Sequence, residues 1–287
     1  MKGVLKMSTF FIPEKSEFVE ANGVHFAYRK FGKETGTPLV CLVHFRGTME
    51  NWDPELMGRL AADRPVIIFD NTGIGESSGE TPSTVAQMAK DAASFINALG
   101  LKQVDILGFS LGGFVAQELV MQHPDLIRRV ILAGTAPRSG TGLRSRNDVR
   151  EASTGNIEDA DSAIQQFLFL FYRPTETSRA RGIASLKRIF GQKKFNSSLQ
   201  VLKAQSEAIA EWAKQGSDQS YKWLNNITHP VLVTNGIDDV MVPTENSYIL
   251  TQHLPNAQLI IYPDSGHGHL FQYPHLFAEH AKLFLDA

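Results

Sequence analysis

Short apolar runs and amphipathic segments alternate along most of the chain. The apolar runs predict strands at 38–44, 66–69, 104–107, 129–135, 231–235 and 258–262. Runs of this length with few polar positions are typical of strands buried on both faces of a sheet. The segments between them place apolar residues every three or four positions, as in the predicted helix 84–99. Strands that alternate with helices predict right-handed βαβ units, and hence an α/β fold with a mostly parallel sheet flanked by helices.

The beginning of the chain departs from this alternation. Residues 17–31 predict two strands joined at Asn22-Gly23, a dipeptide that favours a tight hairpin turn. We expect the hairpin to add antiparallel strands at one edge of the sheet.

The middle of the chain departs from it as well, because the alternation stops near Pro137 and resumes at Val231. The interval has helical patterns and no convincing strand, with predicted helices at 161–172, 176–190 and 197–215. We therefore predict a core domain made of residues 1–137 and 227–287. The insertion between its two parts, residues 138–226, is predicted to form a helical cap over the sheet.

A tight turn around Ser110 carries the clearest chemical signal. The predicted strand 104–107 runs into Gly108-Phe109-Ser110-Leu111-Gly112, and a helical pattern follows at once. A Gly-x-Ser-x-Gly turn between a strand and a helix is typical of a nucleophile elbow. Its glycines remove the Cβ atoms that would clash, so the backbone can lift the serine hydroxyl clear of the sheet. Ser110 is therefore the predicted nucleophile.

A serine nucleophile needs a base and a group that orients the base, and both should follow later strands of the sheet. Asp238 and Asp239 come just after the strand 231–235, and His267, between two glycines, follows the strand 258–262. The resulting order of Ser, Asp and His is the order found in this kind of triad. From the residues alone, only one of the two aspartates can face His267. Asp70 also ends a strand, but we expect it to brace the glycine-rich loop 70–79.

Taken together, the motifs resemble those of α/β-hydrolase-fold serine hydrolases with a helical cap, over essentially the whole length. The motifs that carry the resemblance are His44-x-x-Gly47, Asp70-x-x-Gly73-x-Gly75-x-Ser77, Gly108-x-Ser110-x-Gly112-Gly113, Gly236-x-x-Asp239-x-x-x-Pro243 and Gly266-His267. The resemblance implies Ser110 as nucleophile, Asp239 as the acid and His267 as the base. It implies acyl transfer through an acyl-enzyme.

The loop after the first parallel strand departs from the family pattern. Members usually carry His-Gly-x there, whereas this chain has His44-Phe45-Arg46-Gly47. By position, the resemblance implies that the backbone N–H groups of Leu111 and Arg46 form the oxyanion hole. The Arg46 side chain either reaches an anionic group of the substrate or lies solvated at the rim of the pocket.

The predicted helix 161–172 gives the main indication of substrate, because it is apolar on nearly all sides. A helix of this kind is buried on both sides, so one side could pack within the cap and the other could roof the pocket. The alternative is that all its aromatic rings belong to the core of the cap. The candidate pocket residues are Phe45, Phe109, Phe167 and Phe171.

The composition of the chain bears on which partners it binds and in which cellular compartment it acts. The 287 residues are 43% hydrophobic and 20% charged, with a net charge of −2, which gives no reason to expect nucleic acid or a membrane as partner. No apolar run approaches the roughly 20 residues of a membrane helix. The single Cys41 fits a reducing cytosol, so we expect a cytoplasmic monomer or homodimer that acts on a small molecule.

His267-x-His269 lacks an obvious third ligand, and we expect neither a metal nor a cofactor.

The sequence therefore predicts a serine hydrolase of a small, largely apolar ester. Three alternatives stay open: hydrolysis of a carbon–carbon bond in ring-fission products, cofactor-free perhydrolysis or haloperoxidation, and a small-molecule receptor without turnover. A dehalogenase or an epoxide hydrolase is disfavoured, because those enzymes use an aspartate at the position of Ser110.

Overall fold

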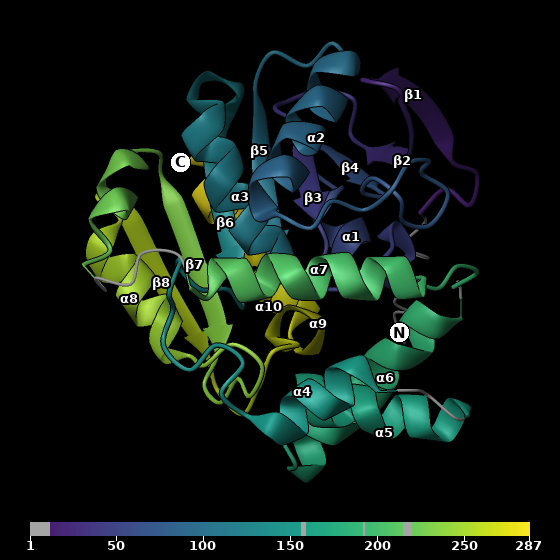
Figure 1. Ribbon diagram of the computed structural model, residues 1–287, viewed down its shortest axis with the longest axis vertical. Helices are drawn as coiled ribbons and strands as arrows, with labels where there is room; N and C mark the ends of the chain where they lie inside the picture. Colours follow the sequence, from purple (N-terminus) through teal and green to yellow (C-terminus); the bar gives the residue numbers. More distant parts are fainter. Residues whose placement is uncertain (1–11, 156–158, 192, 215–219) are drawn as a thin grey trace, which may run out of the picture.

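A single eight-stranded sheet forms the centre of the molecule (Figure 1). The computed structural model describes residues 12–155, 159–191, 193–214 and 220–287. In spatial order the strands are β1 (Glu17–Ala21), β2 (Val24–Gly32), β4 (Pro65–Phe69), β3 (Leu39–Leu42), β5 (Val104–Phe109), β6 (Ile127–Ala133), β7 (Val231–Gly236) and β8 (Ala257–Tyr262). Strands β3 to β8 are parallel, and β1 and β2 are antiparallel at one edge. The predicted fold class is confirmed.

The opening hairpin is also as predicted. Ala21 pairs with Val24, and Asn22 and Gly23 occupy the turn with φ values of 50° and 79°. Positive φ at both central residues matches the twist of the two strands, and Asn-Gly tolerates it at little cost.

Helices cover both faces of the sheet. Alternate residues of β3 point to opposite sides, so that Val40 joins one apolar cluster and Cys41 joins the other. The first cluster lies under α2 (Val85–Ala98), α3 (Leu111–Gln122) and α8 (Glu245–His253), and the second under α1 (Pro54–Leu60) and α10 (Pro274–Asp286). No helix in the described part of the chain is long and apolar enough to cross a membrane.

Between β6 and β7 the described residues form helices and no strand. They are α4 (Asn147–Thr154), α5 (Ala160–Phe171), α6 (Glu176–Phe190), α7 (Leu199–Trp212) and the 3-10 helix η3 (Lys222–Asn226). Helices α5, α6 and α7 match the three predicted ones to within a few residues, whereas α4 was not predicted, because Val149 is its only buried residue. The predicted core and cap ranges include residues 1–11, 156–158, 192 and 215–219, which lie outside the described residues.

Polar contacts hold the inserted helices against the strand-bearing part of the chain. The Arg188 guanidinium on α6 donates to the Asp53 carboxylate, with a shortest distance of 2.6 Å. The Glu50 carboxylate accepts from the backbone N–H groups of Lys194 and Phe195 at 2.6 and 3.1 Å. In Figure 1, α7 runs across the middle of the view, and α4, α5 and α6 lie together below it.

Candidate active site

Ser110 occupies the sharp turn between β5 and α3. Its φ of 58° and ψ of −119° are strained for a residue with a side chain, as expected of a nucleophile elbow. The neighbouring glycines are required by close backbone approach. A Cβ on Gly112 would lie 2.0 Å from the Leu42 carbonyl oxygen, and one on Gly108 would lie 2.6 Å from the Gly112 carbonyl oxygen.

His267 meets Asp239, 28 positions earlier in the sequence, inside the protein. Nδ1 of His267 lies 2.6 Å from Oδ2 of Asp239, and both side chains are fully buried. The other oxygen of Asp239 accepts from the N–H groups of Met241 and Val242, which fixes the carboxylate. Because the carboxylate accepts, Nδ1 carries the proton, and in the neutral tautomer of the ring Nε2 is the nitrogen with the free lone pair. Nε2 has no hydrogen-bond partner among the described residues.

The structure distinguishes the two adjacent aspartates. Asp238 pairs with Arg173 at 3.2 Å on the surface, where more than half of its side chain is exposed. Of the two aspartates, Asp239 is the one that contacts His267.

His269 is a buried structural neighbour of this pair. Its Nε2 lies 3.0 Å from the Thr234 hydroxyl and its Nδ1 lies 3.2 Å from the His267 carbonyl oxygen. Burial lowers the pKa of His269 to about 3, so the ring is neutral at physiological pH. The described residues contain no group of three or more His, Cys, Asp or Glu side chains arranged to hold a metal ion.

The two expected oxyanion donors differ in their surroundings. The N–H of Leu111 begins α3 and has no acceptor among the described residues. Arg46 has a positive φ of 60°, and its N–H donates to Oε1 of Gln205 on α7 at 2.6 Å. The second donor is therefore engaged by a side chain of the inserted helices.

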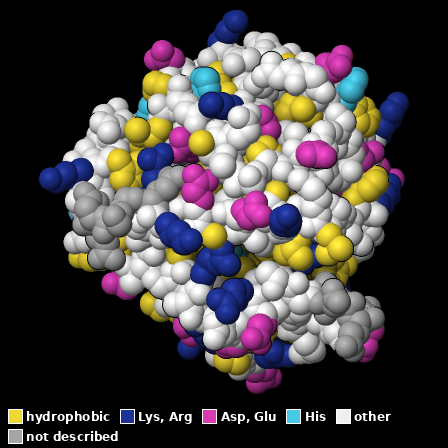
Figure 2. Space-filling view, in the orientation of Figure 1, with side chains coloured by type: hydrophobic (Ala, Val, Ile, Leu, Met, Phe, Trp, Pro, Cys, Tyr) yellow, Lys and Arg dark blue, Asp and Glu magenta, His cyan; other side chains and the backbone are white. Residues whose placement is uncertain are grey.

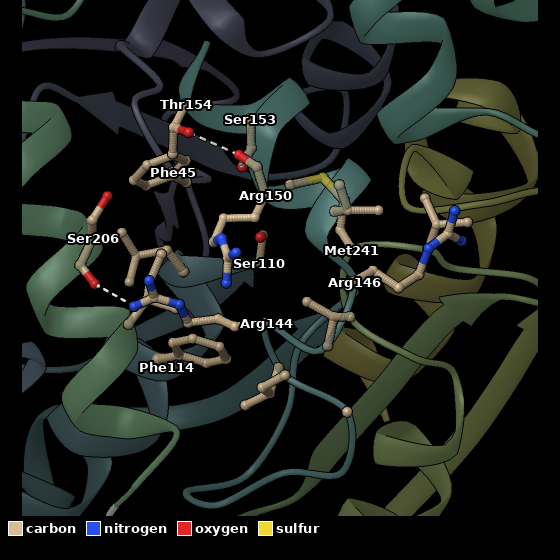
Figure 3. A pocket seen from close by; sticks show the side chains of 17 residues that line it. Phe45, Ser110, Phe114, Arg144, Arg146, Arg150, Ser153, Thr154, Ser206 and Met241 are labelled. Atoms are coloured by element: carbon tan, nitrogen blue, oxygen red, sulfur yellow. Dashed lines mark hydrogen bonds between the residues drawn. The ribbon is translucent and has the colours of Figure 1, made fainter.

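Two cavities meet at Ser110. The main cavity has a volume of about 690 Å³ and also contains His267, His44, Arg46 and aromatic residues of the inserted helices. The side cavity, of about 100 Å³, is lined by apolar residues and by Arg144, Arg146 and Arg150 at its mouth. Figure 3 shows Ser110 within the side cavity, with Arg150 extending toward it.

Three of the four predicted pocket residues line these cavities. Phe45 lines both, and Phe167 and Phe171 line the main cavity with their rings stacked at 4.5 Å. Phe109 lines neither cavity, unlike our expectation. Its fully buried ring packs behind the site, 4.9 Å from the ring of His267.

Several residues at the site were not found by sequence reasoning. Gln205, Lys193 and Arg150 reach the site from α7, from the loop after α6 and from α4. Each belongs to a polar stretch that is typical of a solvated surface, so no local pattern distinguishes it. Their placement depends on how the inserted helices lie over the sheet.

A sequence model of the alpha/beta hydrolase fold matches residues 38–274 of this chain. The chain belongs to the α/β hydrolase family. The solved structure of an alpha/beta hydrolase fold protein from Chitinophaga pinensis is similar to this α/β hydrolase. It is 40% identical in sequence, the match covers 97% of this chain and 99% of that one, and the TM-score is 0.88.

Two further relatives match the α/β hydrolase over most of its length. A Mycobacterium tuberculosis protein provisionally named non-heme bromoperoxidase BpoC is 29% identical over 271 residues, covering 88% of this chain and 94% of the relative. The proline iminopeptidase PfmaB of Pestalotiopsis fici is 28% identical over 275 residues, covering 88% and 92%. These names differ in reaction and in substrate, so the comparisons support a hydrolase-fold enzyme without specifying its substrate.

Proposed function

We propose that this α/β hydrolase cleaves a small carboxylic ester with a largely apolar body, through a serine-bound acyl intermediate. The observation that carries the proposal is the buried contact of 2.6 Å between His267 and Asp239. His267 lines the same cavity as the strained Ser110. Nucleophile, base and orienting acid are the three groups that acyl transfer requires.

The proposed reaction begins when Nε2 of His267 takes the proton of Ser110 and the hydroxyl oxygen attacks the ester carbonyl. The N–H groups of Leu111 and Arg46 stabilise the oxyanion, and His267 then protonates the departing alcohol. Water, activated by the same imidazole, releases the acid and restores Ser110. Asp239 holds the ring in the correct tautomer and stabilises the imidazolium that forms in both steps.

Apolar side chains around the cavity support an ester with an apolar body. Ile164, Phe167, Leu170 and Phe171 of α5 and Phe190 of α6 line the main cavity. Cavities of several hundred cubic ångströms with such linings hold small molecules, with a few polar groups fixing their orientation. We further propose that the enzyme acts in the cytoplasm, which is supported by its single, fully buried cysteine.

The proposal is tested by hydrolysis of short p-nitrophenyl esters. Ser110→Ala and His267→Ala should each lower kcat by about 10³-fold or more, while the far-ultraviolet circular dichroism spectrum stays unchanged. Asp239→Asn should lower kcat far more than Asp238→Asn, which is the matched control because Asp238 lies on the surface. If Asp238→Asn is the crippling change, or if wild type and Ser110→Ala hydrolyse esters equally, the proposed triad is wrong.

Perhydrolysis is a second candidate, favoured by the similarity to the relative provisionally named as a bromoperoxidase. In that reaction hydrogen peroxide takes the place of water and attacks the acyl carbon of the acyl-enzyme. The bond between that carbon and the Ser110 oxygen breaks, the acyl group is released as a peracid, and Ser110 recovers its proton. Measuring peracid formation from acetate and peroxide in wild type and Ser110→Ala tests this candidate directly. Peracid formed equally by both proteins would exclude it.

A further inference from the structure

Positive charge is concentrated around Ser110, although the chain has a net charge of −2. The described residues that line the two cavities include one carboxylate, Asp159, and five lysine or arginine side chains: Arg46, Arg144, Arg146, Arg150 and Lys193. Figure 2 shows Lys and Arg side chains gathered near the middle of this face, between α7 and α4. A cleft with one sign of charge concentrates ligands of the opposite sign.

Most of these cations have no acidic partner among the described residues. Arg146 pairs with Asp148 at 2.6 Å, but no described carboxylate lies within ion-pair distance of the other four. Arg144 donates instead to the Ser206 carbonyl oxygen, and Arg150 to the Asn147 side chain. Both are exposed at the mouth of the side cavity, where water solvates them.

Lys193 and Arg46 lie deeper, in the main cavity. Arg46 donates to the Ser197 hydroxyl at 3.1 Å and to the Ser153 carbonyl oxygen at 3.4 Å, which aims its guanidinium without neutralising it. Lys193 is half-buried, and Glu50, the acid whose charge acts on it, is already engaged by Arg29 and by two backbone N–H groups.

Burial lowers the pKa of Lys193, the Glu50 carboxylate opposes the shift, and the Arg46 guanidinium adds to it. Two cations that have reduced solvation and no carboxylate at ion-pair distance destabilise each other. An anion bound between them would remove both costs.

We infer that the main cavity binds a carboxylate of the substrate at Lys193 and Arg46, next to the aromatic wall formed by α5. The inference rests on the proposed ester hydrolysis and narrows its substrate class. The substrate is an ester with an apolar body and one further carboxylate on its acyl or alcohol part. The exposed arginines at the mouth of the side cavity increase the local concentration of such anions before they bind.

Two pairs of matched esters test the inference. The acyl pair is p-nitrophenyl pentanoate and mono-p-nitrophenyl glutarate, which differ only by a terminal carboxylate. The alcohol pair is phenyl butanoate and 4-carboxyphenyl butanoate. The quantity measured is the ratio of kcat/KM for the charged ester to kcat/KM for the neutral one.

In at least one pair the wild type should prefer the charged ester. Lys193→Met should lower the ratio about tenfold or more, because a charge-assisted hydrogen bond is lost. Lys193→Arg should retain most of the ratio. The matched control is Lys194→Met, because Lys194 is exposed, lines neither cavity and contacts Glu50 only through its backbone.

The outcomes separate the two proposals. Ser110-dependent hydrolysis with no preference for the charged ester in either pair overturns the inference and leaves the proposed function standing. A ratio that falls equally in Lys193→Met and Lys194→Met also overturns it, since the effect would then be one of general charge. No turnover of any of the four esters overturns the proposed function, and the inference with it.

Discussion

At the scale of single residues, the site contains two strained backbone positions that line the same cavity. Ser110 and Arg46 both have positive φ, at 58° and 60°, although neither is glycine. Such conformations cost about 1–3 kcal/mol each and persist where surrounding contacts hold them. Arg46 is held by Gln205 through its N–H and by Ser197 through its side chain. The inserted helices therefore fix the loop that is expected to stabilise the oxyanion.

The hydrogen bond from Arg46 to Gln205 leads to a prediction about catalysis. If the Arg46 N–H stabilises the oxyanion, Oε1 of Gln205 competes with the substrate for that donor. Removing the competitor in Gln205→Ala should raise kcat for neutral esters by up to about fivefold, equivalent to one hydrogen bond of about 1 kcal/mol. Steady-state kinetics with p-nitrophenyl butanoate measures the change.

Gln200→Ala is the matched control for that substitution. Gln200 is on the same helix and also contacts the strand-bearing part of the chain, through Thr81. Its replacement should leave kcat unchanged. A 100-fold fall in kcat confined to Gln205→Ala would mean that the glutamine itself is required, and would contradict the assignment of Arg46 as an oxyanion donor.

The three expected catalytic residues could be predicted from the sequence, whereas Gln205 could not. Ser110, Asp239 and His267 each follow a strand of the parallel sheet, and parallel strands bring their carboxyl ends to one edge of the sheet. Gln205 lies in the middle of a helix, and nothing in its spacing indicates that it reaches Arg46. Likewise, no pattern separates Lys193, which lines the main cavity, from Lys194, which is exposed.

At the scale of elements, the strands and the core helices were predictable because their burial is regular. Helix α4 was not, because it is polar and its short length leaves little periodicity to detect. Asp70 was expected to brace the glycine-rich loop, and this is confirmed. Its carboxylate accepts from the N–H of Glu76 in that loop at 3.0 Å, and from the N–H of Met49 at 2.7 Å.

The loop braced by Asp70 gives a prediction about stability. A Cβ on Gly75 would lie 2.1 Å from Oδ2 of Asp70, and φ at Gly75 is positive at 56°. Gly100 also has a positive φ, 73°, but nothing lies within 4 Å of its would-be Cβ. Gly100→Ala should therefore lower the free energy of unfolding by about 1–2 kcal/mol through backbone strain alone. Gly75→Ala should cost about 1–3 kcal/mol more, because overpacking adds to the strain.

Urea unfolding followed by tryptophan fluorescence measures both variants. Equal losses for the two variants would show that the loop moves aside at no cost, and that Asp70 does not hold it rigidly.

At the scale of the whole molecule, the enzyme combines a regular sheet that carries the reacting groups with inserted helices that form most of the cavity wall. Ser110, Asp239 and His267 follow β5, β7 and β8, whereas α5, α6 and the loop after α6 supply most of the remaining lining of the main cavity. We therefore propose that chemistry and substrate selection belong to different parts of the chain.

The division predicts that changes in α5 alter substrate selection without impairing the chemistry. Phe167 lines the main cavity, stacks on Phe171 and meets the edge of Phe190. Phe167→Ala enlarges the cavity, so kcat/KM for p-nitrophenyl octanoate should rise relative to the butanoate. Each additional buried methylene stabilises binding by about 0.8 kcal/mol, so the ratio should change by at least several-fold.

The control for Phe167→Ala is Phe169→Ala, two residues along the same helix. Phe169 is 39% exposed and lines neither cavity, so its replacement should leave the chain-length preference unchanged. The melting temperature of each variant separates the two interpretations of the aromatic helix. If Phe167 belongs only to the core of the inserted helices, Phe167→Ala will lower the melting temperature and leave the octanoate-to-butanoate ratio as it was. A shifted ratio at a nearly unchanged melting temperature means instead that the ring is part of the wall that contacts the substrate.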